Sequence, residues 1–252
     1  MSGMPNLRRF TIVTGHYGCG KTNLAMNLAL DLAARAGAGD AGAPGAGDAQ
    51  AVTLVDLDIV NPYFRSSDYT ALLEARGVRV ISPTFAGTTL DTPSLPAAIA
   101  SAFESAGPVV LDAGGDDAGA TALGRYSHEI GAIDHDLLYV VNRYRNLTST
   151  PPEAAALLAE IEGAAHLSAT GVVNNSHLRE ETTAETVLGS MAYARESAAR
   201  LGLPLVCTTV PRWLAHEFSE DAGDASFVEN AYPIEVYVHT PWEDVSRVDE
   251  EV

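Results

Sequence analysis

Residues 15–22 form the segment of this chain whose residue types and spacing are best suited to chemistry. They read GHYGCGKT and match G-x-x-x-x-G-K-[ST], between an apolar segment and a helical pattern. The glycines let backbone amides turn toward an anion, and a helix that begins here adds the positive end of its dipole. In this pattern the lysine contacts the β- and γ-phosphates of a nucleotide, and the hydroxyl ligates Mg²⁺. We therefore predict a nucleotide site formed by Gly15, His16, Tyr17, Gly18, Cys19, Gly20, Lys21, Thr22 and Asn23.

Lys21 is the only lysine in the chain, because all the other residues among its 15 Lys and Arg are arginine. The usage rich in Ala, Gly and Arg is typical of a GC-rich genome, which replaces lysine with arginine wherever arginine serves. A compact ammonium on a flexible stem differs physically from a broad planar guanidinium. We infer that position 21 requires a lysine, which supports the predicted phosphate contact.

Two carboxylates follow the apolar residues of the segment VDLD. Asp56 and Asp58 alternate along the predicted strand and therefore share one of its faces. One of them can hold the water shell of Mg²⁺, and the other can orient or deprotonate an attacking water. The alternative is a solvated strand end without a role in chemistry.

A third carboxylate, Asp112, follows four apolar residues in PVVLDAGG, which is the arrangement of a Walker B motif. The glycine pair that follows it, Gly114 and Gly115, lets a backbone amide approach a terminal phosphate. We predict that Thr22, Asp56 and Asp112 are metal ligands, and that Lys21, Asp58 and Asp112 are catalytic.

Apolar strands alternate with helical patterns along the chain. Strands are expected at residues 9–15, 51–60, 78–83, 108–115, 135–142, 167–175, 203–211 and 234–239. Helices are expected at residues 21–35, 69–76, 152–163 and 183–201. This alternation predicts an α/β fold with a mostly parallel, seven- or eight-stranded sheet covered by helices on both faces. Ligands of such sheets bind at the carboxyl ends of the strands, where the polar clusters lie.

The length of 252 residues and the hydrophobic content of 46% suit one domain, which we place at residues 1–240. Residues 36–51 are almost all Ala, Gly, Asp and Pro, so we expect a flexible insertion there. Residues 241–252 form an acidic tail.

The net charge of −18 argues against nucleic acid and anionic membranes as partners, because both would be repelled. The sequence has no apolar run long enough to span a membrane, and residues 1–10 lack the apolar core of a signal peptide. Two distant cysteines, Cys19 and Cys207, make neither a disulfide framework nor a metal cluster. We therefore expect a cytoplasmic protein. Cys19 either is redox-sensitive or fills a variable small-residue position.

The segments GHYGCGKTN, VDLDIVNPYFRS, DAGGDDAGATALGRY and GVVNNSHL together resemble the SIMIBI class of P-loop NTPases. Within this class, the chain is most similar to the ParA/MinD/CobQ-type nucleotide-binding domain and to a little-characterised bacterial ATP-binding family. The resemblance covers residues 10–213. It implies that Asp58 orients the attacking water and that Asp112 and Gly115 belong to the second switch. It also implies that Asn174 contacts the base and that Pro211 lies in the segment that packs along the base.

The sequence departs from dimeric ParA/MinD-type enzymes at the start of the loop. Those enzymes have a lysine, as in K-G-G-x-G-K-T, that reaches the nucleotide of the partner chain, whereas His16 occupies the aligned position here. A homodimer of this chain is possible, but an arginine would have to supply that charge. Arg65 is the first candidate for this catalytic role, with a surface ion pair as its alternative, followed by Arg125 and Arg143.

P-loop GTPases recognise guanine through N-K-x-D, which this chain cannot form without a second lysine. We therefore predict ATP and Mg²⁺ as cofactors. Three functions are compatible with the sequence. The first is slow ATP hydrolysis that drives a conformational switch in residues 59–68 and 113–125 on a protein partner. The second is a small-molecule kinase or ATP-dependent ligase, and the third is a nucleotide-binding module without turnover.

Overall fold

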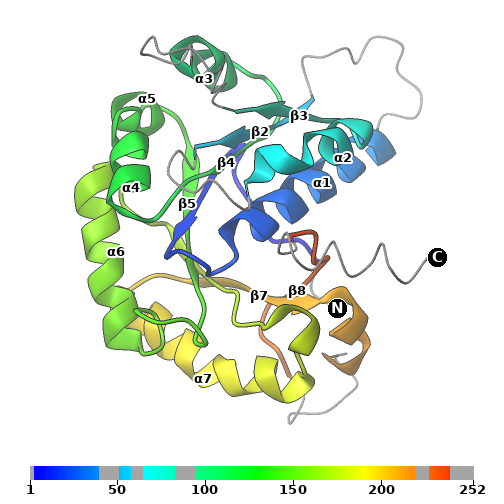
Figure 1. Ribbon diagram of the computed structural model, residues 1–252, viewed down its shortest axis with the longest axis vertical. Helices are drawn as coiled ribbons and strands as arrows, with labels where there is room; N and C mark the ends of the chain where they lie inside the picture. Colours follow the sequence, from blue (N-terminus) through cyan, green and yellow to red (C-terminus); the bar gives the residue numbers. More distant parts are fainter. Residues whose placement is uncertain (1–2, 40–50, 58–64, 83–94, 219–226, 239–252) are drawn as a thin grey trace, which may run out of the picture.

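The computed structural model describes residues 3–39, 51–57, 65–82, 95–218 and 227–238, which form one parallel sheet between two layers of helices (Figure 1). The strands are β1 (Phe10–Gly15), β2 (Val52–Asp56), β3 (Val78–Ile81), β4 (Val109–Asp112), β5 (His135–Val141), β6 (Gly171–Asn174), β7 (Leu205–Pro211) and β8 (Ala231–Ile234). Their order in the sheet is β3-β2-β4-β1-β5-β6-β7-β8, and all neighbouring pairs are parallel. The predicted sheet is thus confirmed.

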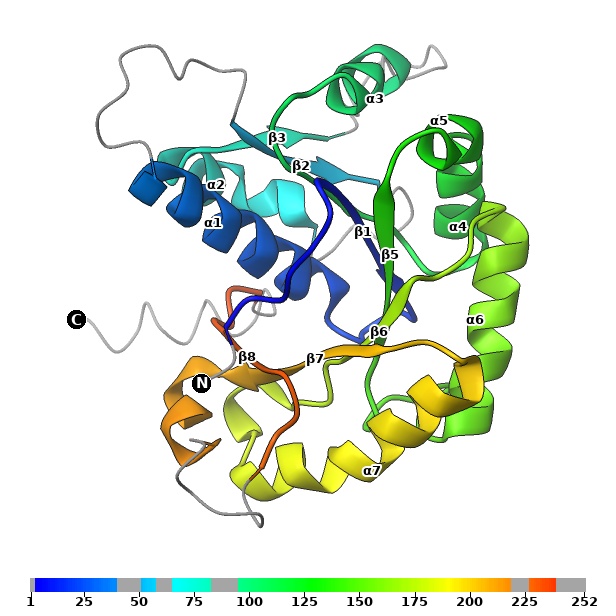
Figure 2. The same cartoon turned by 180° about the vertical axis from the view of Figure 1, so that it is seen from behind.

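The helices are divided between the two faces of the sheet (Figures 1 and 2). They are α1 (Lys21–Gly39), α2 (Thr70–Ala75), α3 (Leu95–Phe103), α4 (Asp117–Gly124), α5 (Ser127–Gly131), α6 (Pro151–Ala165) and α7 (Ala184–Leu201). The 3₁₀ helices are η2 (Ser66–Tyr69), η3 (Arg179–Glu181) and η4 (Arg212–Phe218). Helices α1 and α2 pack on one face, and α3 to α7 lie on the other.

The central strands contribute alternate side chains to the two larger of three hydrophobic cores. In β5, Leu137 and Tyr139 pack toward α6 and α7, whereas Leu138 and Val140 pack toward α1. Successive side chains of a strand point to opposite faces, and both faces of this sheet are covered by helices. The strands therefore read as continuous apolar runs, which hold the carboxyl ends of β1, β4, β5 and β6 in fixed positions.

Two boundaries differ from those expected. Helix α1 continues to Gly39 and so includes the first residues of the predicted insertion 36–51, of which residues 40–50 lie outside the described part. The edge strand is β8 at residues 231–234, not 234–239. Residues 235–238 leave the sheet and bind α1, since Asn27 donates to the Glu235 carbonyl at 2.8 Å and accepts from its amide at 2.8 Å.

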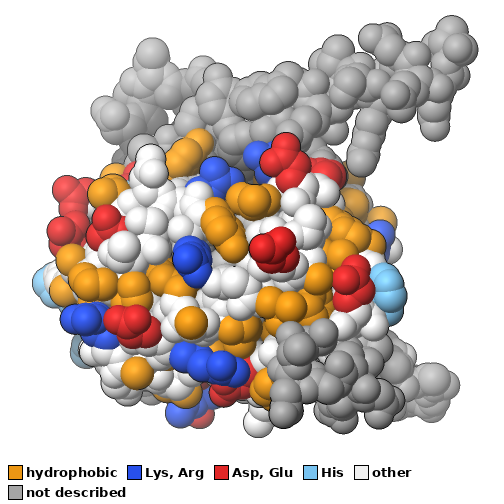
Figure 3. Space-filling view, turned by 90° about the horizontal axis from the view of Figure 1, so that it is seen from below, with side chains coloured by type: hydrophobic (Ala, Val, Ile, Leu, Met, Phe, Trp, Pro, Cys, Tyr) orange, Lys and Arg blue, Asp and Glu red, His pale blue; other side chains and the backbone are white. Residues whose placement is uncertain are grey.

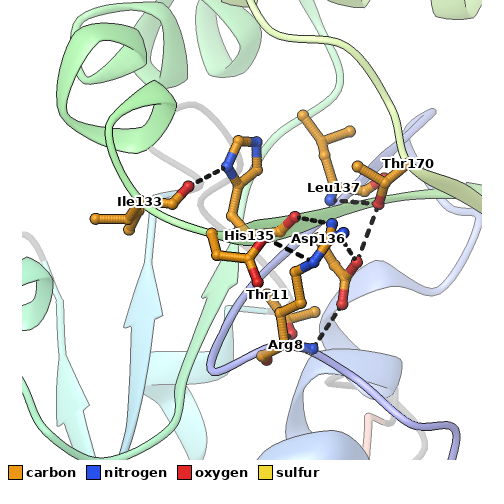
Figure 4. Close-up of polar contacts among 8 residues, drawn as sticks. Arg8, Thr11, Ile133, His135, Asp136, Leu137 and Thr170 are labelled. Carbon is orange, nitrogen blue, oxygen red and sulfur yellow. Dashed lines mark hydrogen bonds and ion pairs between the residues drawn. The ribbon is translucent and has the colours of Figure 1, made fainter.

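The amino edge of the sheet is closed by a network that we call the amino-edge clamp, formed by Arg8, Asp136 and Thr170 (Figure 4). The Asp136 carboxylate accepts from the Arg8 amide at 2.7 Å and from the Thr170 hydroxyl at 3.3 Å. The Thr170 hydroxyl in turn accepts from the Leu137 amide at 3.0 Å. The clamp thereby ties the segment before β1 to β5 and to the start of β6.

The surface mixes charges of both signs with apolar side chains. From below, the side on which α7 lies in Figure 1, basic, acidic and hydrophobic side chains are interspersed (Figure 3). None of the helices among the described residues combines the length and the apolar character that a membrane span requires.

Candidate nucleotide-binding site

The loop that joins β1 to α1, residues 15–22, is called the glycine loop here. Its three glycines, Gly15, Gly18 and Gly20, have φ angles of 151°, 75° and 87°, which side chains disfavour. At Gly20 a side chain is also excluded by space, because a β-carbon there would overlap the side-chain amide of Asn175. The Cys19 amide donates to the His16 carbonyl at 3.2 Å and closes the loop. The sequence pattern therefore corresponds to a compact loop of backbone amides.

Lys21 and Thr22 are the first residues of α1, so they lie at the positive end of its dipole. Lys21 is buried, with 6% of its surface exposed, and its ammonium donates to the His16 carbonyl at 3.2 Å. The ammonium is therefore directed back over the glycine loop. Burial, and secondly the charge of Lys21, lower the pKa of His16. The His16 ring is thus neutral at pH 7 and adds no charge to the loop.

The glycine loop is also supported by Asn175, which sequence reasoning did not select. Its amide donates to the Cys19 carbonyl at 2.7 Å, and its carbonyl oxygen accepts from the Thr209 hydroxyl at 2.6 Å. Asn174, the predicted base contact, is fully buried and donates to Ser190 Oγ at 2.9 Å. Adjacent residues of a strand point to opposite faces. Asn175 is thus the residue that reaches the loop, while the Asn174 Oδ1 atom is buried without a partner among the described residues and its base contact stays a prediction.

The carboxylates Asp56 and Asp112 end neighbouring strands and are fully buried. They lie opposite each other in the register of β2 and β4, and Asp112 also pairs with Val13 of β1. The Asp56 carboxylate accepts from the Ser67 amide at 3.2 Å. Two of the three predicted carboxylates therefore lie at adjacent strand ends, with β4 and its Asp112 next to β1. Asp58, the third, lies outside the described residues.

The segment after β4 contacts the glycine loop directly. A β-carbon at Gly115 would overlap the carbonyl oxygen of Gly15, so only glycine permits this approach. The next residue, Asp116, caps α4 by accepting from the Gly119 amide at 2.8 Å. A displacement of this segment would therefore also displace Gly15, the first residue of the glycine loop.

Two residues predicted to contact the nucleotide, Asn23 and Pro211, also have structural partners within the chain. The side chain of Asn23 holds the C-terminal segment, because it donates to the Glu235 carbonyl at 2.9 Å and accepts from the Tyr237 amide at 2.8 Å. This leaves only the backbone of Asn23 for a nucleotide. Pro211 is buried at the end of β7, opposite Ile234 of β8.

The predicted arginines are spread over the molecule. Arg65 precedes η2, where its amide donates to the Asp68 carboxylate at 3.1 Å. Arg125 is exposed after the far end of α4, and Arg143 donates to the Gly189 carbonyl on α7. The guanidinium that lies beside the glycine loop belongs to Arg145, which was not predicted. Its Nε would lie 3.8 Å from a β-carbon at Gly18.

These residues fit a phosphate chain with its magnesium ion. Arg145 Nε and Thr14 Oγ1 are buried atoms that have no hydrogen-bond partner among the described residues. Together with Lys21 and the loop amides, Arg145 provides donors for phosphate oxygens. The Thr22 hydroxyl and the Asp112 carboxylate are oxygen ligands of the kind Mg²⁺ prefers. Within the described ranges, no three His, Cys, Asp or Glu residues cluster as a metal site. A magnesium ion would therefore depend on phosphate oxygens as well.

A scan of known protein families gives no match to the sequence, and no curated protein is similar enough to match. Solved structures do match. The cell division protein FtsY of Thermotoga maritima aligns with a TM-score of 0.51 and 17% identity, over 83% of this chain and 64% of that chain. FtsY of Mycoplasma mycoides aligns with a TM-score of 0.52 and 13% identity, over 83% and 62%.

The signal recognition particle receptor FtsY of Elizabethkingia anophelis, solved in complex with GDP, aligns with a TM-score of 0.51 and 14% identity, over 83% of this chain and 60% of that one. The chain thus spans less than two thirds of each of these FtsY chains. The ParA/MinD/CobQ-type branch remains a prediction. At these identities the likeness concerns the fold, and the chain has the fold of the SIMIBI class of P-loop NTPases, to which FtsY belongs.

Proposed function

We propose that this chain binds ATP with Mg²⁺ at the glycine loop, hydrolyses the ATP slowly, and thereby switches its conformation toward a protein partner. The observation that carries the proposal is the position of Lys21. This single lysine is buried at the start of α1, with its ammonium directed over a loop of three positive-φ glycines. A charged ammonium held in this way is well suited to contact phosphate oxygens.

The residues beside the loop support a hydrolytic role. ATP supplies the phosphoanhydride bond, and Mg²⁺ neutralises charge on its phosphates. The Thr22 hydroxyl and Asp112 would hold the ion, directly or through water. Asp56 would hold water molecules of the ion's shell. Asp58 is proposed to orient the attacking water, as the resemblance implies. Because Asp112 is buried in a strand that pairs directly with β1, its carboxylate is fixed relative to the loop.

The proposed switch rests on two contacts near the terminal phosphate. Gly115 touches the carbonyl of Gly15, and the Ser67 amide binds Asp56. These contacts connect the segment 113–125 and the described residues 65–68 to the strand ends around the loop, while residues 59–64 of the proposed switch lie outside the described part. Loss of the terminal phosphate would remove a group that both segments can contact, and so release them.

ATP is proposed over GTP because a second lysine is absent. The FtsY of Elizabethkingia anophelis binds GDP. The N-K-x-D motif by which P-loop GTPases recognise guanine has no counterpart at the end of β6, where Asn174, Asn175 and Ser176 follow one another. The polar side chain that reaches the loop here is that of Asn175.

A protein partner is proposed because large apolar side chains are exposed around the same edge of the sheet. Tyr17 lies in the glycine loop, Tyr144 and Leu147 follow β5, and Trp213 follows β7, and all four are exposed. Exposed aromatic and aliphatic residues that cluster near a nucleotide site are typical of protein contacts. A second copy of this chain is one such partner.

Calorimetry and a phosphate-release assay test the proposal. We expect Mg·ATP to bind more tightly than Mg·GTP, and ATP to be hydrolysed slowly without a partner. A metabolite that raises turnover about a hundredfold would support a small-molecule kinase or ligase instead, since such a change corresponds to about 2.7 kcal/mol in the barrier. Tight binding without turnover under all conditions would support a binding module. Tighter binding of GTP would contradict the choice of base.

A further inference from the structure

We propose that Arg145 binds the terminal phosphates of the nucleotide held by its own chain. This inference rests on the proposed nucleotide site and adds a phosphate-contacting residue to it. The sequence predicts such an arginine at position 65, 125 or 143, but the geometry points to Arg145.

The backbone around Arg145 is held firmly after β5, the strand that pairs with β1 on the side opposite β4. The Arg145 amide donates to the Asn142 carbonyl at 3.1 Å, and the Thr148 hydroxyl donates to the same carbonyl at 2.9 Å. The Asn142 side chain accepts from the Tyr144 amide at 2.9 Å. These bonds form a compact turn that fixes the direction in which the Arg145 side chain leaves the backbone.

The Arg145 side chain runs along the glycine loop at Gly18. Its Nε, Cδ and Cζ atoms would lie 3.8, 3.9 and 4.0 Å from a β-carbon at that position. A β-carbon at Gly18 would thus be in ordinary van der Waals contact with the guanidinium, which lies beside the loop where Gly18 has a φ of 75°. The middle of such a loop is where backbone amides surround the phosphate chain.

The charge of Arg145 is not neutralised by a partner in the described part of the chain. Its Nε is buried without a hydrogen bond there, and no described carboxylate forms an ion pair with it. A buried donor without a partner costs about 1–3 kcal/mol, and more when it is charged. A phosphate would satisfy it, because the planar guanidinium can donate two parallel hydrogen bonds to phosphate oxygens.

Charges of both signs lie around His177, the neighbour of Arg145: Arg145 and Arg179 are basic, and Glu180 is acidic. Burial, and then the charges of Arg145 and Arg179, lower the pKa of His177 to about 4. The ring of His177 is therefore neutral at pH 7, and its Nδ1 accepts from the Arg179 amide at 3.3 Å. Together with Lys21, whose ammonium binds the His16 carbonyl of the same loop, the two arginines outnumber Glu180, so this edge favours anions.

Arg145 could also replace a positive charge that is missing at His16. In dimeric ParA/MinD-type enzymes this position is a lysine that reaches the nucleotide of the partner chain. A guanidinium from the same chain supplies positive charge at the loop without a second chain. Arg143, two residues earlier, differs because its side chain is occupied by the Gly189 carbonyl of α7. Arg143 is therefore a matched control.

The test compares Arg145→Ala, Arg145→Lys and Arg143→Ala by calorimetric titration with Mg·ATP, Mg·ADP and AMP. We expect Arg145→Ala to weaken ATP binding about 10- to 100-fold, since hydrogen bonds to charged groups contribute about 1.5–3 kcal/mol. ADP binding should fall less, AMP binding should be unchanged, and Arg145→Lys should recover part of the loss. Arg143→Ala should bind like the wild type. Equal ATP affinity of Arg145→Ala and wild type would overturn the inference.

Two further measurements separate the inference from the proposed function. By NMR, the pKa of His177 should rise in Arg145→Ala without any nucleotide, and an unchanged pKa would contradict the position of Arg145. Mixing Arg145→Ala with Lys21→Arg should not restore turnover, because the arginine acts within its own chain. Restored turnover would show that Arg145 acts on the nucleotide of a second chain, and it would not contradict the proposed nucleotide binding. If the wild type binds no nucleotide, the proposed function itself fails, and the inference with it.

Discussion

At the amino edge of the sheet, Asp136 accepts hydrogen bonds from Arg8 and Thr170, so that the clamp satisfies its own polar groups (Figure 4). At the carboxyl edge, by contrast, Thr14 and Arg145 have buried polar atoms without a partner among the described residues. Both edges belong to the same sheet and are held by the same two cores. The difference in hydrogen bonding between the edges therefore does not come from different core packing. It indicates that the carboxyl edge has polar groups available for a ligand.

The comparison separates polar groups that stabilise the fold from polar groups that are available to a ligand. Buried polar atoms in folded proteins are nearly always paired, because an unpaired one costs free energy. Groups without a partner elsewhere, such as the Ser197 hydroxyl on α7, are isolated. At the carboxyl edge, by contrast, Arg145 Nε lies beside the glycine loop, which is a specific indication of an anionic ligand.

The largest effect is expected for Lys21→Arg, which keeps the charge but replaces a compact ammonium with a planar group. We expect the loss of measurable turnover and of tight ATP binding, because the guanidinium cannot occupy the place of the buried ammonium over the loop. Calorimetry and phosphate release measure both quantities, and circular dichroism checks the fold. If the variant kept wild-type affinity and turnover, Lys21 would not serve ligand binding, and the carboxyl edge would lose its main functional difference from the amino edge.

A smaller effect concerns the pH dependence of stability at the carboxyl edge. The pKa of His177 is about 4 in the folded chain, because of burial and the charges of Arg145 and Arg179, with Glu180 acting in the opposite direction. Below pH 6.5 the unfolded chain therefore takes up a proton that the folded chain does not. Stability should fall as pH decreases toward 4, by on the order of 3 kcal/mol from this group.

Urea unfolding between pH 7 and pH 4 measures this effect, with His177→Gln as the reference. Subtracting the variant from the wild type removes the contribution of the carboxylates that titrate in the same range. Parallel pH profiles for the two proteins would show that His177 is not held neutral by its surroundings.

Substitutions in the amino-edge clamp should lower the free energy of unfolding and leave ATP affinity unchanged, whereas substitutions in the glycine loop should lower ATP affinity. Asp136→Ala removes the acceptor of the Arg8 amide and of the Thr170 hydroxyl, and should lower the free energy of unfolding by about 1–3 kcal/mol. Asp136→Asn retains one acceptor oxygen and should lose less. ATP affinity should be unchanged in both variants. A loss of ATP affinity in Asp136→Asn with normal stability would connect the two edges.

The smallest effect is expected for Arg8→Ala. The Arg8 side chain is 45% exposed, and its partner Asp134 is 83% exposed. Exposed ion pairs contribute at most about 1 kcal/mol and are screened by salt. Urea unfolding at low and high salt should show a small difference that disappears at high salt. A loss as large as that of Asp136→Ala would mean that the ion pairs, and not the acceptors on Asp136, hold the clamp.

The sheet and the glycine loop could be predicted from the sequence because their signals are local. Apolar runs set the strands, and the pattern from Gly15 to Thr22 needs no information from elsewhere in the chain. Helices α3 to α5 were missed because they have five to nine residues each, too few to show a clear helical periodicity. The edge strand was displaced by three residues, since residues 235–238 are apolar in pattern but bind α1 through Asn23 and Asn27.

The rest of the site depended on the tertiary structure. Asn174 and Asn175 are chemically identical in the sequence, and only the parity of β6 determines which of them faces the glycine loop. Arg143 and Arg145 are likewise two residues apart. The turn after β5 directs one to α7 and the other to Gly18. Which of two nearby residues reaches the glycine loop cannot be predicted from their spacing along the chain.

The most direct test of the account is an NMR titration of the wild-type chain with Mg²⁺ and a non-hydrolysable ATP analogue, monitored through backbone amides. We predict that chemical-shift changes concentrate at residues 15–22 and at Asn175 and Arg145. The amides of Arg8, Asp136 and Thr170 should remain unchanged. The absence of changes in the glycine loop at millimolar analogue, or changes centred on the amino-edge clamp, would contradict the assignment of the nucleotide site to the carboxyl edge.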